Sequence, residues 1–533
     1  MTESYKMLRE GRKQELWNKH CGYVTLKPKD FLEIQTRLLQ EQLKLIGASQ
    51  LGQTIIGEHP PQTVEEFRQT VPFTTYSDYE DLLAERNEEI LPVKPHVWAR
   101  TSGRTSDKGP KWVPYPKLMY ERLGDAVVGA MLMASCSFPG DVRLERNDKL
   151  LLATAPPPYT SGYISRACEE QLEVQFLPPI EEGEKMDYGT RLAAGFQLAM
   201  RHGLDYFMGL ASVLARMGEQ FESTSGSTTK PSKDLLNPRV LWRLLRALII
   251  TKIQNRNLLP KDIWKLKGIM SGGTDTNIYR DKIEYYWGFK PLEGYATTEF
   301  GNLAMQSWNF RGMTFFPDAA FFEFIPIEEH RRNKEEPNYI PRTVLYTDLE
   351  PGIYEIVLTS FHGGVFLRYR IGDFFEVISI GDDEINSSLP QLSFYSRVTD
   401  IIDIGNIARF TERDIWKALE NANLPYTDWI VRKEHLNAHP QLHIYIEPKA
   451  DAAIDSVEAK QKIDNHLGNL VAEYEDLKTM FDYDPLVVSL LPEGAFQTYM
   501  AAQVAAGADL AHIKPPHMQP SDQVMSRLKE VKD

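Results

Sequence analysis

Four short segments, which occur in a fixed order, constrain the function of this chain more than any other feature. They read TSGRTSDKGPK at Thr101–Lys111, YATTE at Tyr295–Glu299, YRIGD at Tyr369–Asp373 and RVTDIIDIG at Arg397–Gly405. A hydroxyl-rich loop with two glycines and a terminal lysine can wrap a polyphosphate, because small residues let backbone N–H groups approach and the lysine neutralises charge. One such loop is weak evidence, but the ordered set predicts nucleotide chemistry.

The size and composition of the chain predict a globular protein with more than one domain. It has 533 residues, of which 42% are hydrophobic and 25% charged, as in ordinary globular proteins. The formal net charge of −14 argues against a general nucleic-acid binder, because neutralising phosphates requires clustered Lys and Arg. We therefore expect phosphate to be bound locally and no nucleic-acid partner.

The cysteines, the N-terminus and the most apolar stretch of the sequence indicate the cellular compartment of the protein. Cys21, Cys136 and Cys168 are odd in number and widely spaced, so they predict neither a disulfide framework nor a zinc site. The charged N-terminus has no apolar run and is not a secretory signal. The most apolar stretch, Val240–Ile253, is interrupted by basic residues, which predicts a packed amphipathic helix rather than a membrane span. We expect a cytoplasmic protein with no membrane role.

The periodicity of apolar residues predicts the α/β class. Beyond about residue 396 the pattern changes to an alternation of strand and helix, so we place the domain boundary there, beside Arg397. The chain is thus divided into an N-terminal domain at 1–395 and a smaller C-terminal domain at 396–533. The predicted helices are 28–50, 76–89 and 190–218, and the predicted strands include 149–154 and 172–176.

The loop at 101–111 has two interpretations. As a phosphate-binding loop, it would hold the β and γ phosphates through backbone N–H and hydroxyl donors, and its last lysine would add positive charge. As an ordinary Gly/Ser turn after a strand, it would have no function, and the loop alone supports both interpretations equally. The residues concerned are Thr101, Ser102, Gly103, Thr105, Ser106 and Lys111, with Arg104 inside the run.

Carboxylates in the second and third segments are candidates for the metal and the ribose. Glu299 would sit where Mg²⁺ bridges phosphate oxygens, because this hard cation takes one or two carboxylates together with phosphate oxygens. Asp373 could accept from both ribose hydroxyls. The alternative for Glu299 is a surface glutamate at a strand end, and the alternative for the segment of Asp373 is a plain turn. Tyr295, Thr297 and Thr298 flank Glu299 and complete this part of the predicted nucleotide site.

The fourth segment predicts a contact to the nucleotide and a hinge. Arg397 would contact the ribose or the α-phosphate, and Asp400 would lie at a hinge for the last domain. The alternative for the two is a surface ion pair that contributes little. Separately, Ser271, Gly272 and Gly273 end an apolar strand and could line the adenine, although a glycine turn is equally compatible with their spacing.

The ordered motifs resemble the adenylate-forming superfamily of acyl-CoA synthetases, luciferases and peptide-synthetase adenylation domains. The run Tyr354–Ser360 leading into FLRYRIGD, and the C-terminal Gly494–Pro516, are similar to the auxin-responsive acyl acid amido synthetases and their bacterial relatives. The resemblance implies a large N-terminal adenylate-forming domain of mixed sheets and helices, and a smaller mobile α+β C-terminal domain. It also implies ATP and Mg²⁺ as cofactors.

The resemblance implies an ATP-dependent ligase that forms AMP and pyrophosphate. A small carboxylic acid would be adenylated and its acyl group transferred to an amine, an amino acid, to form an amide. Lys111, Arg397 and Lys514 would supply the catalytic positive charges, with Lys514 delivered by the mobile domain. The alternative interpretation of Lys514 is a solvated lysine before two prolines. A CoA thiol as acceptor, in an acyl-CoA ligase of the same superfamily, is the other possible second step.

Three departures from the family pattern support a further alternative. Arg104 interrupts the hydroxyl run of the loop, Phe300 replaces a small residue after the motif glutamate, and His362 begins an unusual approach to the third segment. A non-catalytic nucleotide-binding homologue therefore stands beside the enzyme. The acyl pocket is expected on the helix Leu118–Met133, with Tyr159, Tyr163 and Phe207 as candidate walls, although plain core positions are the favoured interpretation of these three. The identity of the acid, the identity of the amino acid and the oligomeric state are not predicted.

Overall fold

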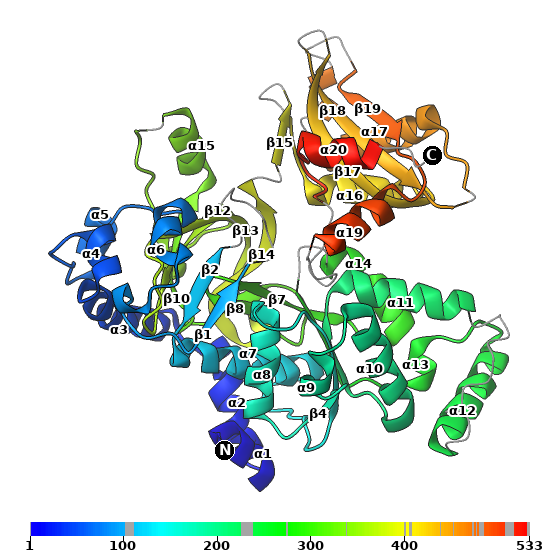
Figure 1. Cartoon of the computed structure of the whole chain (residues 1–533), viewed down its shortest axis with the longest axis horizontal. Coiled ribbons are helices and arrows are strands. Elements are labelled where there is room, and N and C mark those ends of the chain that lie inside the picture. The colour runs from blue at the N-terminus through cyan, green and yellow to red at the C-terminus, as the bar shows by residue number, and fades with distance from the viewer. Residues whose placement is uncertain are drawn as a thin grey trace. The chain divides into compact units, whose positions relative to one another are not determined.

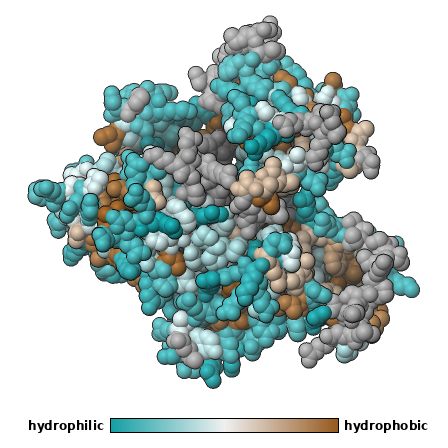
Figure 2. All heavy atoms as spheres, viewed as in Figure 1, coloured by the Kyte–Doolittle hydropathy of each residue, from teal (hydrophilic) through white to brown (hydrophobic). Residues whose placement is uncertain are grey.

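The computed structural model (Figure 1) consists of two compact units. The N-terminal unit comprises Met1–Ile371 and Phe375–Phe394, and the C-terminal unit comprises Gly372–Phe374 and Tyr395–Asp533. The face shown in Figure 2 is mostly hydrophilic, with hydrophobic residues gathered in small patches. The structure describes residues 2–101, 111–224, 238–272, 276–336, 338–398, 401–404, 408–436, 439–450, 452–471, 474–475, 477–478, 484–506 and 516–529.

The N-terminal unit begins with a series of helices, the first of which is bounded by its own capping residues. The Thr2 hydroxyl accepts from the Tyr5 N–H at the start of the first helix, and Gly11 ends it with φ 71°, a left-handed conformation that favours glycine. The predicted helix at 76–89 is wrong for most of its length. A capping box from Thr75 to Asp78 and a positive φ at Arg86 divide it into short turns. The helices are α1 Glu3–Glu10, α2 Lys13–Cys21, α3 Pro28–Gly47, α4 Gln50–Ile56, α5 Val64–Thr70 and α6 Glu80–Ala84.

A twelve-stranded mixed sheet forms the centre of the N-terminal unit, in the order β11-β10-β12-β13-β14-β9-β8-β7-β6-β5-β3-β4. The strands from β4 to β7 run parallel, and β7, β8 and β9 pair antiparallel. The α/β class is therefore confirmed. The strands are β3 Lys149–Ala153, β4 Gln175–Leu177, β5 Tyr206–Gly209, β6 Gly268–Gly272, β7 Pro291–Thr297, β8 Gly301–Gln306, β9 Met313–Phe315, β10 Ala320–Pro326, β11 Val344–Leu345, β12 Gly352–Ser360, β13 Tyr369–Asp382 and β14 Ser387–Arg397.

The helices between the parallel strands cover the sheet. The predicted helix at 190–218 is interrupted by β5, because the short apolar run at Tyr206–Gly209 lies between β3 and β6, and a short apolar run has no period that distinguishes helix from strand. The predicted strand at 172–176 begins three residues later. The helices are α7 Lys117–Ser135, α8 Thr160–Gln171, α9 Ile180–Gly183, α10 Tyr188–His202, α11 Ala211–Thr224, α12 Pro238–Gln254, α13 Pro260–Ile263, α14 Thr276–Trp287 and α15 Ile327–Glu335.

The C-terminal unit is a small α+β fold. Its three-stranded sheet has the order β17-β18-β19, and the buried Glu447 carboxylate on β18 accepts from the N–H groups of Gly494 and Phe496 at the start of α19. No helix in the described part of either unit is long and apolar enough to cross a bilayer. Its elements are β15 Ile401–Ile404, β16 Ala408–Thr411, α16 Glu412–Asn421, β17 Tyr426–Leu436, β18 His439–Pro448, α17 Ser456–Leu470, β19 Leu486–Leu490, α19 Ala495–Ala505 and α20 Asp522–Lys529.

Candidate active site

The loop at 101–111 connects the two strands of an antiparallel hairpin. Strands β1 (Val97–Arg100) and β2 (Trp112–Tyr115) pair along their length, and the Thr101 N–H donates to the Lys111 carbonyl at 3.0 Å. The two ends of the loop are therefore held together, as a loop that wraps a ligand requires. Five of its predicted site residues lie outside the described residues: Ser102, Gly103, Arg104, Thr105 and Ser106.

Lys111 lies against an aromatic ring that sequence reasoning did not identify. Its Nζ is 4.8 Å from the centroid of the Tyr76 ring, a cation–π contact. The Tyr76 hydroxyl accepts from the Trp112 N–H at 2.8 Å and donates to the Trp112 carbonyl at 3.2 Å. Tyr76 thus fixes the end of the hairpin loop. It lies in a polar turn near the N-terminus, where the sequence carried no functional signal.

Glu299 is a buried carboxylate surrounded by tyrosines. It is 7% exposed, and the Tyr369 hydroxyl donates to its Oε1 at 3.2 Å. Burial raises the pKa of Tyr76 to about 12 and the pKa of Tyr369 still further, and the negative charge of Glu299 adds to both. Both phenols therefore stay protonated at neutral pH. A buried carboxylate near neutral hydroxyls is an environment that a cation would stabilise.

The residues around Glu299 are held by hydrogen bonds of the β7–β8 turn. The Thr297 hydroxyl accepts from the Phe300 N–H at 3.1 Å, and the Thr298 carbonyl accepts from the Tyr115 hydroxyl at 2.7 Å. Tyr295 is buried, with its ring 4.8 Å from that of Phe375 in an edge-on contact. These contacts fix the position of Glu299.

Ser271 and Gly272 end β6 beside β7, at the carboxyl edge of the parallel strands. Ligands of open α/β sheets bind at this edge. Ser271 is buried, and its hydroxyl lies 3.2 Å from that of Thr276, whereas Gly272 is exposed. The backbone at Gly272 is thus the accessible part of this segment. Gly273 lies outside the described residues.

The C-terminal unit holds Asp373, the predicted ribose residue, together with Arg397, which was predicted to contact the ribose or the α-phosphate. Asp373 is completely buried, and the Arg397 Nε lies 2.9 Å from its Oδ1. Gly372 has φ 83°, which a residue with a side chain adopts only with strain. The predicted hinge Asp400 and the predicted catalytic Lys514 lie outside the described residues.

Two unsatisfied polar atoms at the start of the hairpin loop fit a polar ligand. The Thr101 Oγ1 and the Arg100 Nε are buried, and neither has a hydrogen-bond partner among the described residues. Arg100 Nη2 donates to the Tyr159 hydroxyl at 2.6 Å, which positions the guanidinium. Such orphaned groups cost free energy unless a ligand or water satisfies them. Arg100 precedes the motif, so the motif alone did not include it.

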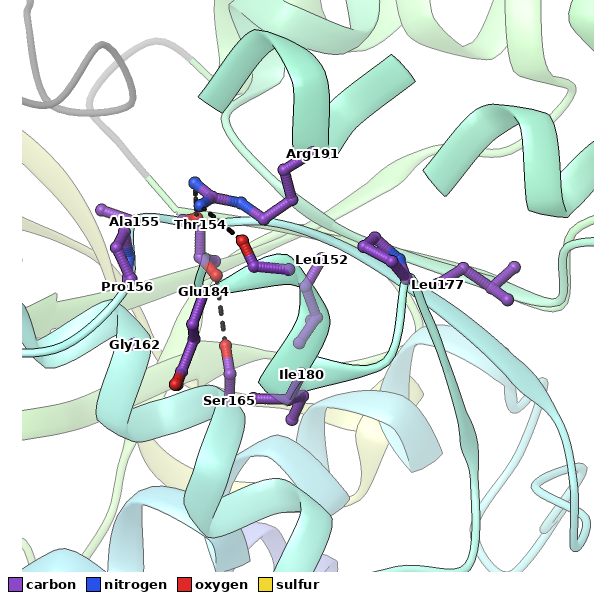
Figure 3. A pocket seen from close by; sticks show the side chains of 12 residues that line it. Leu152, Thr154, Ala155, Pro156, Gly162, Ser165, Leu177, Ile180, Glu184 and Arg191 are labelled. Atoms are coloured by element: carbon purple, nitrogen blue, oxygen red, sulfur yellow. Dashed lines mark hydrogen bonds between the residues drawn. The ribbon is translucent and has the colours of Figure 1, made fainter. Parts of the chain in front are cut away.

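A pocket opens at the carboxyl ends of β3 and β4 (Figure 3). Arg191, which is buried, donates to the Thr154 carbonyl at 2.7 Å, and the hydroxyls of Thr154 and Ser165 lie 3.1 Å apart. The cavity has a volume of about 30 Å³, which is large enough for water but too small for an organic acid. The pocket borders α8, which also carries Tyr163, one of the residues considered as an acyl-pocket wall. Phe207, another, is buried in the core beside Trp287.

Models of the three domains of one family match this chain in order. The GH3 family N-terminal domain matches residues 24–166, the central domain 313–397 and the C-terminal domain 413–523. The chain belongs to the GH3 family. The three matches together cover more than half of it, and the resemblance to the acyl acid amido synthetases is confirmed.

Curated GH3 relatives are distant. The chain is 27% identical over 257 residues to an indole-3-acetic acid-amido synthetase, GH3.4 of Arabidopsis thaliana, a match that covers 45% of this chain and 41% of that protein. A probable indole-3-acetic acid-amido synthetase, GH3.11 of Oryza sativa subsp. japonica, is 26% identical over 38% of this chain and 36% of its own length. The matches thus span about two fifths of the length of these relatives.

Solved structures show the same fold over the whole length. The GH3.15 acyl acid amido synthetase in complex with 2,4-DB matches with a TM-score of 0.66 at 18% identity, covering 95% of this chain and 94% of that one. A 2-hydroxyisobutyryl-CoA ligase in the postadenylation state matches with a TM-score of 0.56 at 14% identity, covering 98% and 93%. The adenylate-forming fold is therefore confirmed.

Proposed function

We propose that this GH3 protein is an acyl acid amido synthetase, which uses ATP to activate a small carboxylic acid and transfers the acyl group to the amine of an amino acid. One observation carries the proposal. Residues of three sequence-distant motifs converge in the N-terminal unit, where Lys111 lies on Tyr76 and Tyr369 donates to the buried Glu299. The charge of Glu299 also acts on Tyr76, which joins the two contacts into one site.

The chemistry of the first step follows from what a carboxylate lacks. It is a poor electrophile, so one of its oxygens must become part of a leaving group before an amide can form. A carboxylate oxygen attacks the α-phosphorus of ATP, a new P–O bond forms, and the bond to pyrophosphate breaks. The protein's part in such a step is positioning and charge neutralisation. Lys111 and Arg397 would supply the positive charge, and no nucleophilic side chain is required.

The residues present fit ATP and Mg²⁺. Glu299 is a buried carboxylate suited to a metal, and Thr101 Oγ1 is a buried polar atom suited to a phosphate oxygen. Mg²⁺ would neutralise phosphate charge when bound. Asp373 would accept from the ribose hydroxyls, and the backbone at Gly272 would lie by the base. No cluster of three or more metal-ligating side chains occurs in the described ranges, so the phosphates would complete the metal's coordination.

In the second step the amine attacks the activated carbonyl, the C–O bond to AMP breaks, and the amine loses a proton to solvent. We propose that the C-terminal domain rotates between the two steps about a hinge at Asp400 and brings Lys514 to the nucleotide in the first. Lys514→Ala should then reduce ATP–pyrophosphate exchange much more than amide formation from a supplied acyl adenylate. Equal losses in both assays would contradict the rotation.

The proposed compartment is the cytoplasm. Cys21, Cys136 and Cys168 are all buried free thiols, and burial raises the pKa of each one. These thiols suit a reducing environment.

A pyrophosphate-release screen tests the proposed function. Aryl, indolyl and aliphatic acids are each supplied with ATP and Mg²⁺, alone, with a mixture of amino acids, or with CoA. We expect release to depend on one acid class and a new amide to be detected by mass spectrometry only with amino acids. A thioester in place of the amide would show an acyl-CoA ligase. Stabilisation by ATP and Mg²⁺ without release for any acid would show a non-catalytic nucleotide-binding homologue.

A further inference from the structure

Helix α12 exposes the side chains that a surface helix normally buries. The side chains it buries are small, those of Val240, Ala247 and Thr251. The sequence predicted a packed amphipathic helix here, and the helix is present, with Leu244 partly buried against the core. Six of its larger apolar residues are exposed instead of packed. These residues are exposed as follows: Leu241 46%, Trp242 70%, Leu245 47%, Leu248 54%, Ile249 59% and Ile253 79%.

The exposed residues form one continuous stripe, which we call the α12 stripe. At 100° per residue, positions 241, 242, 245, 248, 249 and 253 fall within an arc of roughly 140°, about 18 Å long. The opposite side is tied to the N-terminal unit, where Arg243 Nη1 donates to the Met200 carbonyl at the end of α10 at 2.7 Å. In Figure 1, α12 lies at the edge of the N-terminal unit. The helix is therefore fixed with its stripe facing outward.

The charge of α12 is opposite to that of the whole chain. Its sequence contains Arg239, Arg243, Arg246 and Lys252 and no acidic residue, whereas the chain has a formal net charge of −14. Arg246 and Lys252 are exposed beside and within the stripe. An anionic surface is repelled by the net charge of the protein but attracted by α12, so the charge favours contact at this helix.

We propose that α12 binds the surface of an anionic lipid bilayer and lies in the interface plane with its stripe at the boundary between headgroups and acyl chains. This arrangement buries the apolar side chains, leaves Arg246 at the level of the lipid phosphates and lets Lys252 extend to them. Trp242 is a residue type favoured at that boundary. The proposal departs from the sequence-based expectation of no membrane role.

A second copy of the chain is a poorer occupant. Two α12 helices packed stripe to stripe would bring together Arg246 and Lys252 of both copies, four like charges, which weakens association. An acidic protein groove would match the charge, but the stripe is a convex helix surface with Trp242 and Ile253 standing far out. A soft lipid interface accommodates such side chains without a preformed pocket.

Vesicle flotation with the full-length protein tests the proposal. The vesicles contain phosphatidylcholine alone or with about 30% phosphatidylglycerol. We expect binding to the anionic vesicles that weakens at least about tenfold in Leu245→Glu/Ile249→Glu. The matched control is Phe138→Glu/Ile340→Glu, which adds the same charges at residues 59% and 74% exposed elsewhere, and it should retain binding. Absence of binding, or equal losses in both variants, would overturn the proposal.

The basic residues are tested separately. Arg246→Gln/Lys252→Gln keeps the stripe and, because both residues are exposed, should leave the melting temperature unchanged. We expect severalfold weaker binding to anionic vesicles and a smaller effect of added salt. Equal binding to neutral and anionic vesicles would overturn the role of charge. A concentration-dependent dimer that Leu245→Glu/Ile249→Glu abolishes, without vesicle binding, would show a second copy as the occupant instead.

Discussion

Arg397 and Asp373 form an ion pair within the C-terminal unit, with the Arg397 Nε 2.9 Å from the Asp373 Oδ1. The two partners differ in environment, because the Asp373 side chain is completely buried whereas the Arg397 side chain is 54% exposed. A buried carboxylate is costly without a cation. The partly exposed arginine therefore compensates the charge of the buried carboxylate.

We expect Asp373→Asn to weaken ATP binding. The substitution removes the negative charge that would accept from two hydroxyls, and hydrogen bonds to charged groups contribute about 1.5–3 kcal/mol. Isothermal titration with ATP and Mg²⁺ measures the affinity. Glu376→Gln, in the same strand β13, serves as the control and should bind ATP normally. A correctly folded Asp373→Asn variant with unchanged affinity would remove Asp373 from the site.

Glu299→Gln should separate stability from catalysis. In the unliganded protein the substitution removes a buried charge and keeps the shape, so we expect an equal or higher melting temperature. If Glu299 holds Mg²⁺ as we propose, the added stabilisation by ATP with Mg²⁺ should be lost and pyrophosphate exchange should fall at least a hundredfold, because the variant would lack that ligand. Thermal melts with and without Mg²⁺ measure both effects.

Tyr369→Phe is the control for that experiment. It removes the hydrogen bond to Glu299 but leaves the carboxylate, so Mg²⁺-dependent stabilisation should be largely retained. If Glu299→Gln keeps its response to Mg²⁺, the buried carboxylate is a structural acceptor for Tyr369 and the metal binds elsewhere.

The fold was predictable from the sequence where periodicity was unambiguous. Helical periodicity at 28–50 identified α3, the apolar run Leu118–Met133 identified α7, and the short run at 149–154 identified β3. The strand Tyr206–Gly209 was missed because a short buried run fits either structure. The exposure of the α12 stripe could not be predicted. The sequence shows an apolar helix face, but whether another element packs against that face depends on the tertiary structure.

The candidate site was predictable only where residues form a motif. The order of the segments led to Glu299, Lys111 and Asp373. Tyr76 was not found, because its role comes from its position over Lys111, which is set by folding of segments far apart in sequence. The pairing of Asp373 with Arg397 was also missed, because each residue was assigned a separate contact with the nucleotide.

Arg191 should be important for stability at the carboxyl end of β3. This buried side chain donates to the carbonyls of Thr154, Met186 and Gly183 at 2.7, 3.2 and 3.4 Å. Arg191→Met keeps the apolar stem and removes the donor to all three carbonyls, although that of Gly183 still accepts from the Met186 N–H. A buried acceptor left without a donor costs about 1–3 kcal/mol. We expect a total loss of a few kcal/mol in urea unfolding. Lys185→Met, at an exposed position shortly before the same helix, should cost less than about 0.5 kcal/mol.

His517 anchors the chain that follows the predicted Lys514. Its two ring nitrogens lie 2.6 Å from Glu412 Oε1 and 2.9 Å from Asp428 Oδ1, and its ring stacks on Trp429 at 4.4 Å. Burial lowers the pKa of His517, but the two carboxylates outweigh burial and raise the pKa to about 9 from 6.5. The imidazole is thus charged at neutral pH.

The stability of the C-terminal unit should therefore fall at alkaline pH. The contribution of His517 is complete below pH 6.5, where the unfolded chain is protonated too, and it is lost as the pH rises toward about 9. At about 1.4 kcal/mol for each pH unit between the two values, the loss is on the order of 3 kcal/mol. Urea unfolding between pH 6 and 9.5, followed by tryptophan fluorescence, measures this loss, because Trp416 and Trp429 contact the ring.

The variant His517→Gln should lower the stability at pH 6 and flatten its dependence on pH. His443→Gln is the control, since burial lowers the pKa of His443, the opposite direction to that of His517. A wild-type profile that is flat from pH 6.5 to 9 would mean that His517 is neutral between its two carboxylates.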